Sequence, residues 1–116
     1  MGLAEIEWLE SIDAFESDHI HYESFIDCAK WLTSLFWEVH KVDYVVALTH
    51  IRTNNDKLLA ENVDGVDIFL GGHDHTTVQI IVNNNLIKKS GTDFWEFSLI
   101  TLEKWPKSES DFCYNP

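Results

Sequence analysis

The sequence has little cysteine, and this shortage excludes two kinds of small domain. Its 116 residues include only two cysteines, Cys28 and Cys113, which lie far apart and form no CxxC pair. They make neither a disulfide framework nor a cysteine-based zinc knuckle. A reduced, intracellular setting fits this pattern and slightly favours a cytoplasmic location.

Basic residues and long apolar runs are also scarce. Lysine and arginine number 8 against 20 aspartates and glutamates, which gives a formal net charge of −12. A surface of this sign repels phosphate backbones, so a nucleic-acid partner is not expected. No run of about eighteen apolar residues occurs, so we expect no membrane partner for this chain.

Eight acidic residues precede Lys30, the first basic residue. Charge runs usually lie on solvated faces, so we expect an acidic edge exposed to water. A cation-binding or partner-binding arm is the alternative interpretation. The eight residues are Glu5, Glu7, Glu10, Asp13, Glu16, Asp18, Glu23 and Asp27.

Apolar periodicity predicts strands alternating with helices, followed by antiparallel strands. The predicted fold class is therefore α/β, a layered mixed β-sheet with flanking helices. Residues 1–104 are expected to form the domain, and residues 105–116 a polar tail. The expected elements are a strand over 3–9, a helix over 25–39, a strand over 43–48 buried on both faces, a helix capped by Asn54 or Asn55, a strand over 66–70, a hairpin over 77–89 with a turn at 83–85, and a final strand over 94–102.

Three histidines follow predicted strands, where open α/β sheets bind their ligands. His50 comes after the strand that ends at Leu48, whereas His73 and His75 come after the strand that ends at Leu70. In an extended segment residues i and i+2 project to the same side, so His73 and His75 could both reach one pocket. Neutral imidazole binds Zn, Mn, Fe, Ni or Co, and the sequence does not choose among these metals.

These histidines belong to motifs at a characteristic separation. The motifs are Ala47-Leu48-Thr49-His50, Asn55-Asp56 and Gly71-Gly72-His73-Asp74-His75. Together they resemble the last two metal-binding motifs of calcineurin-like metallophosphoesterases. The flanking stretches Trp8-Leu9-Glu10 and Lys89-Ser90-Gly91-Thr92-Asp93-Phe94 are similar to the 5′-nucleotidase branch of that family. The resemblance implies the C-terminal half of the catalytic domain, and hence half of a metallophosphoesterase sandwich.

The resemblance also implies roles for the three imidazoles. His50 and His73 would bind the second cation of a dinuclear pair, and His75 the first. In such sites two cations clamp a phosphoryl group and a metal-held water attacks it. The implied substrate is a small phosphoester, by resemblance a nucleotide, and no catalytic residue is assigned within this chain.

The family's earlier motifs, which supply an Asp-x-His pair, a bridging Gly-Asp and a catalytic Gly-Asn-His, do not occur in this sequence. Two cations held only by three neutral imidazoles would repel each other strongly at a separation of roughly 3.5–4 Å. We therefore expect this chain alone to bind at most one divalent metal ion, weakly. Little or no phosphoester turnover is expected from it.

Three functions remain open at this point. The leading one is a fragment of a metal-dependent phosphoester hydrolase domain. The others are a non-catalytic binding or assembly module derived from a metallophosphoesterase, and a metal-binding protein that uses only its histidines. Because half of the sandwich is missing, an apolar sheet face should lie uncovered, which predicts a homo-oligomer or association with the missing N-terminal half.

Four further residues have interpretations of their own. Asp74 would face solvent or, less favoured, orient an imidazole. Asp56 would lie in the first turn of a helix, and a catalytic role for it is less favoured. Trp37 would be either a surface aromatic or a contact with a missing partner, and Arg52 could reach a phosphate.

Overall fold

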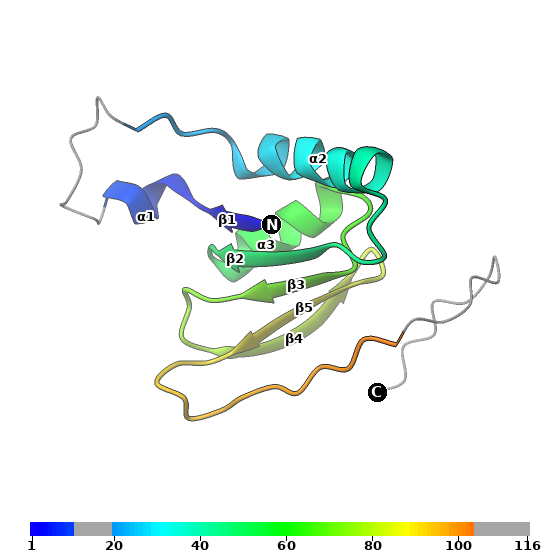
Figure 1. Ribbon diagram of the computed structural model, residues 1–116. Helices are drawn as coiled ribbons and strands as arrows, with labels where there is room; N and C mark the ends of the chain where they lie inside the picture. Colours follow the sequence, from blue (N-terminus) through cyan, green and yellow to red (C-terminus); the bar gives the residue numbers. More distant parts are fainter. Residues whose placement is uncertain (11–19, 104–116) are drawn as a thin grey trace.

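The computed structural model describes residues 1–10 and 20–103, which form a five-stranded sheet with helices packed against it (Figure 1). The strands are β1 (Gly2–Ala4), β2 (Val46–His50), β3 (Ile68–Gly71), β4 (Thr77–Val82) and β5 (Asn85–Ser90). Their order is β1-β2-β3-β5-β4, in which β4 is antiparallel to β5 and the other neighbours are parallel. This confirms the predicted α/β class with a mixed sheet, an architecture consistent with half a metallophosphoesterase sandwich.

The helices are α1 (Ile6–Glu10), α2 (Phe25–Leu35) and α3 (Thr53–Asn62), and α2 continues as a π-helical turn at Phe36–His40. The predicted helix over 25–39 is confirmed. The strand predicted over residues 3–9 is wrong after Ala4, because the chain turns there into α1. So short an alternation of apolar and acidic residues does not separate a strand from a helical turn.

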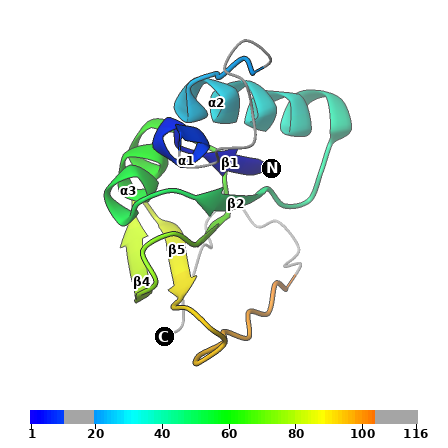
Figure 2. The same ribbon diagram turned by 90° about the vertical axis from the view of Figure 1, so that its left-hand side faces the viewer.

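One face of the sheet forms the core. Ala29 of α2 and Leu59 of α3 pack with Ala47, Phe69 and Ile87 from three strands, and all five are fully buried. Figure 2, which turns the molecule by 90°, shows the helices gathered along one side of the strands. Burying a side chain as large as Phe69 contributes roughly 1.5–3 kcal/mol, so this face supplies much of the stability.

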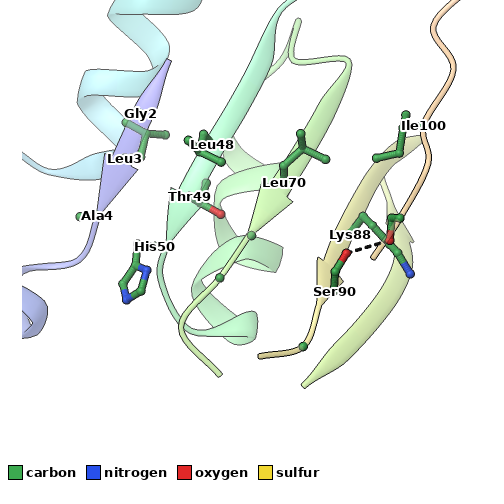
Figure 3. A pocket seen from close by; sticks show the side chains of 14 residues that line it. Gly2, Leu3, Ala4, Leu48, Thr49, His50, Leu70, Lys88, Ser90 and Ile100 are labelled. Carbon is green, nitrogen blue, oxygen red and sulfur yellow. Dashed lines mark hydrogen bonds between the residues drawn. The ribbon is translucent and has the colours of Figure 1, made fainter. Parts of the chain in front are cut away.

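The opposite face of the sheet is open to solvent at β2 and half-exposed at β3 and β5. Leu48, the residue of β2 that alternates with Ala47 and Thr49, is 64% exposed. Leu70 and Lys88 project from neighbouring strands on the same side (Figure 3). The strand predicted over 43–48 is therefore covered on one face only, and the prediction of burial on both faces is wrong for Leu48.

The strand predicted over residues 94–102 does not form. Residues 91–103 run without regular structure, fixed by a 2.8 Å hydrogen bond between the hydroxyls of Ser90 and Ser98 and a 2.6 Å bond from the Tyr44 hydroxyl to the Glu103 carbonyl. Phe94 and Leu99 are 87% and 90% exposed. An apolar β pattern needs a neighbouring strand to pair with, and in the described residues this segment has none.

The hairpin is confirmed, with Asn83 and Asn84 in left-handed conformations at φ 47° and 67°. Asparagine tolerates this conformation better than most residues, and two such residues suit a tight hairpin turn. Trp37 packs within the chain, because its indole N–H donates to the Gly65 carbonyl at 2.7 Å. This contact replaces both interpretations offered for Trp37.

Two predictions concern residues outside the described ranges: the polar tail at 105–116 and part of the acidic edge, including Asp13, Glu16 and Asp18. Among residues 1–10 and 20–103, no helix has the length and apolar character needed to cross a bilayer.

Candidate functional site

Three parallel strands end at one edge of the sheet, and each carries a polar residue at its end or within two residues of it. In the strand register Ala4 lies opposite His50, and Thr49 lies opposite Gly71. Glu5 follows β1, His50 ends β2, and His73 comes two residues after β3. The topology therefore gathers an acid and two imidazoles at this edge, which we call the carboxyl edge.

His50 and His73 lie side by side at the carboxyl edge. Their ring centroids are 5.2 Å apart and the rings meet edge to face at 75°. The ring centroid of Trp8, from α1, lies 5.3 Å from that of His50. Gly72 permits this packing, because a β-carbon there would come 3.3 Å from Nδ1 of His50. His50 also borders a shallow hollow of about 670 Å³ on the open face (Figure 3).

The sequence predicts that His75 reaches the same pocket as His73, but no group of three metal donors forms there in the part of the chain that the structure describes. Residues i and i+2 share a side only in an extended segment, but His73 and His75 both have left-handed backbones, with φ 78° and 53°. The i, i+2 rule for strands therefore does not apply, and His75 is exposed. Two non-glycine residues in this conformation cost of order 1–3 kcal/mol each, and such strain is found at functional loops.

Glu5 is the acid of the carboxyl edge, and only 1% of its side chain is exposed. Its Oε2 accepts a 2.6 Å hydrogen bond from the Asn55 amide. Its Oε1 lies 3.3 Å from Nε2 of His73 and 3.5 Å from Nε of Arg52. The prediction of a solvated acidic edge over residues 5–27 is wrong at Glu5. The chain turns into α1 directly after Glu5, whose carboxylate is buried beside Asn55 and His73.

Arg52 pairs with acids instead of standing free for a ligand. Its guanidinium lies 3.5 Å from both Glu5 and Glu7, and about half of its side chain is exposed. Arg52 precedes α3, whose first backbone N–H, that of Thr53, donates to Oδ2 of Asp74 at 2.6 Å. Asp74 therefore caps α3 from a distant loop, and the predicted capping by Asn54 or Asn55 is wrong.

Lys89 is a buried lysine that ties the loops of the carboxyl edge together. It is 2% exposed, and its Nζ donates to the carbonyls of Ile51 and Gly72 at 2.7 and 2.8 Å. It also lies 2.8 Å from Oδ2 of Asp56 and 2.9 Å from Oδ2 of Asp74. Two of these partners, Gly72 and Asp74, flank His73 in the sequence, so Lys89 fixes the loop on both sides of this histidine.

The two carboxylates around Lys89 are affected differently. Burial raises the pKa of Asp56, against hydrogen bonds from Lys89 and Thr49 that lower it. Burial also raises the pKa of Asp74, but hydrogen bonds from Thr53 and Lys89, with the charge of Lys89, outweigh it and lower the pKa to about 2. Asp74 is thus an anchored anion, in contrast to the favoured prediction of a solvent-facing group, and Asp56 is in the first turn of α3 as predicted but fully buried.

The donor set of this chain does not by itself fit the two-cation centre implied by the resemblance. Among the described residues no three His, Cys, Asp or Glu side chains lie close enough to hold a metal ion. Two imidazoles are adjacent, and the acid beside them, Glu5, is engaged by Asn55 and Arg52. The assignment of His50, His73 and His75 as metal ligands remains a prediction.

Sequence reasoning missed Glu5 and Lys89. A signal existed for Glu5, because an acid directly after an apolar strand points to the same edge as histidines that follow parallel strands. Lys89 carried a weaker signal: in β5 it alternates with Ile87 on the buried face. A lysine in phase with core residues is rarely buried unless a charge partner awaits it.

Comparison with known proteins gives a partial relation. No protein-family model matches the chain. Over 49 residues, 40% of the chain, it is 49% identical to the trifunctional nucleotide phosphoesterase protein YfkN of Bacillus subtilis (strain 168). The match spans only 3% of that relative's length. The chain is therefore related in part to a nucleotide phosphoesterase, which agrees with the resemblance seen in the motifs.

Proposed function

We propose that this chain is a fragment of a metal-dependent phosphoester hydrolase domain of the 5′-nucleotidase kind. The observation that carries the proposal is the His50–His73 pair at the carboxyl edge, in a chain partly related to a nucleotide phosphoesterase. A nucleotide is the proposed substrate on the strength of that relation alone. The chain contributes metal-binding histidines, and the carboxylate ligands and catalytic groups come from elsewhere.

Each histidine has a proposed part in this function. His50 and His73 offer two imidazoles at one place, and His75, two residues further on, is the third proposed ligand. The loop that carries His73 is held by Lys89, so its position does not depend on a bound ion. Zn, Mn, Fe, Ni and Co all suit imidazole donors.

The activity of the isolated chain tests this division of roles. We expect no metal-stimulated hydrolysis of p-nitrophenyl phosphate or of nucleoside monophosphates above that of a His50→Ala/His73→Ala variant. Mn²⁺ and Co²⁺ should be tried at several concentrations with tag-free protein. Robust turnover that copurifies with the chain and is lost in the double variant contradicts the idea that the remaining groups lie elsewhere.

Metal binding tests the ligand assignment. Calorimetric titration of the tag-free chain with Co²⁺ should give at most one weakly bound ion, and His50→Ala or His73→Ala should abolish the binding. His40→Ala is the matched control, because His40 is an exposed histidine at the end of the π-helical turn. Equal binding by all four proteins argues against a site at His50 and His73.

The open sheet face supports a second candidate, a non-catalytic assembly module. Leu48 is 64% exposed there, and the site at the same edge is incomplete. We propose that the occupant of this face is an apolar sheet from an N-terminal half of such a domain, while pairing with a second copy is the other outcome of the test. Sedimentation of the chain at micromolar concentration tests this. A dimer indicates pairing with a second copy, and Leu48→Glu should then abolish it. An ordered monomer that stays monomeric with Leu48→Glu argues against an association surface on this face.

A further inference from the structure

The side chain of Glu5 is almost completely buried. A carboxylate with 1% exposure loses nearly all its hydration, which costs several kcal/mol unless charged or polar partners replace the water. Asn55 satisfies one oxygen, Oε2. The other oxygen, Oε1, is buried and has no hydrogen bond among the described residues. A buried unpaired oxygen of this kind calls for an explanation.

The nearest donors show what Oε1 faces. Nε2 of His73 is 3.3 Å away and Nε of Arg52 is 3.5 Å away. Arg52 is shared with Glu7 and is half exposed, so it can turn toward water. His73 has less freedom, because its ring is 28% exposed and packs against His50. Of these two neighbours of Oε1, the His73 ring is the nearer and the more buried.

The orientation of the His73 ring also has to be fixed by some contact. Lys89 holds the carbonyl of Gly72 and the carboxylate of Asp74, which fixes the backbone on both sides of His73. These contacts act on the backbone around His73 and on Asp74, so they do not decide which ring nitrogen of His73 carries the proton. In a neutral imidazole, the hydrogen bond at one nitrogen decides which nitrogen keeps its lone pair.

We propose that Glu5 is a positioning residue for His73: a small turn of the ring lets Nε2–H of His73, 3.3 Å from Oε1 of Glu5, donate a hydrogen bond to that oxygen. This holds the neutral imidazole in its Nε2–H form and leaves Nδ1 as the nitrogen with an available lone pair. The consequence for a bound cation rests on the proposed function, since ligating histidines commonly donate their second N–H to a carboxylate. The contact itself does not depend on that function.

The ring tautomer of His73 tests the proposal directly. Two-bond ¹H–¹⁵N correlation spectra of the ¹⁵N-labelled chain, at a pH where imidazoles are neutral, report which nitrogen is protonated; a His73→Asn spectrum assigns the signals. We expect the Nε2–H form in the unmodified chain. In Glu5→Gln the Asn55 amide donates to the glutamine carbonyl oxygen, so the glutamine NH₂ turns toward His73 and the ring should switch to Nδ1–H.

Glu7→Gln is the matched control. It makes the same acid-to-amide change in a neighbouring residue that pairs with Arg52 and has no described contact with His73. His73 should remain Nε2–H in this variant. A predominantly Nδ1–H ring in the unmodified chain overturns the proposal without any variant, as does an identical His73 spectrum in a folded Glu5→Gln protein.

The Co²⁺ titration of the same samples separates this proposal from the proposed function. If Glu5 supports a ligand, Glu5→Gln should weaken Co²⁺ binding by about 10- to 100-fold. Unchanged Co²⁺ binding in His73→Asn refutes the ligand role, while the tautomer result alone decides the role of Glu5.

Discussion

Replacing Lys89 by methionine removes the positive charge that pairs with two carboxylates, Asp56 of α3 and Asp74 of the histidine loop. Methionine keeps most of the apolar length of the side chain, so the change deletes the ammonium and little packing volume. Asp56 is left fully buried beside it, and the carbonyls of Ile51 and Gly72 lose their charged donor. We expect Lys89→Met to destabilise the fold severely.

The size of the effect follows from the burial of the pair. Breaking a buried ion pair by removing one partner costs about 3–5 kcal/mol, because the remaining charge stays uncompensated. The two carbonyls add to this, although such costs are not additive. A loss of about 4 kcal/mol is large beside the total stability of about 5–15 kcal/mol typical of a domain.

Urea unfolding followed by tryptophan fluorescence measures the change in the free energy of unfolding. Lys88→Met is the matched control, because Lys88 is the preceding residue of β5 and lies on the open face (Figure 3). Its effect should stay within about 0.5 kcal/mol, as for most partly exposed sites. Adding Asp56→Asn to Lys89→Met should recover part of the loss, since the stranded charge is then gone.

The penalty of Lys89→Met should depend on pH. Burial already raises the pKa of Asp56 above its ordinary value of 3.8, and losing Lys89 removes a group that lowers it. The folded state then binds a proton more tightly than the unfolded state, so the variant gains stability as pH falls through the raised pKa toward 3.8. A Lys89→Met protein as stable as Lys88→Met, with no such gain, refutes the account of Lys89 as a charge clamp.

Two further substitutions test the packing that supports the site. Gly71→Ala should destabilise the fold by about 1–3 kcal/mol, because the added β-carbon would lie 2.8 Å from Cε of the buried Lys89. Gly2→Ala is the control: its β-carbon would have no atom within 4 Å, so the change should be near neutral in the same urea assay. Trp37→Phe should cost about 1 kcal/mol in thermal unfolding through loss of the bond to the Gly65 carbonyl, whereas Trp31→Phe, at a residue 63% exposed, should leave the melting temperature nearly unchanged.

The elements of the fold were largely predictable from local patterns. The stripe over 25–39 and the hairpin around Asn83 and Asn84 each satisfy a spacing rule that acts over a few residues, and both are present. Failures arose where the local pattern was too short, as at residues 3–9, or where a β pattern lacked a strand to pair with, as at 94–102. Pairing partners are decided by the whole sheet and not by the segment itself.

The sequence by itself determined that His50 and His73 would meet, since residues that end adjacent parallel strands share one edge. It did not determine the path of the loop after Gly71, and the left-handed backbones at His73 and His75 defeated the i, i+2 argument. Only the tertiary structure revealed Glu5 beneath the histidines and Lys89 between Asp56 and Asp74. Charges buried in this way are stabilised by partners that lie far away in the sequence, and no local pattern of residues predicts which partners those are.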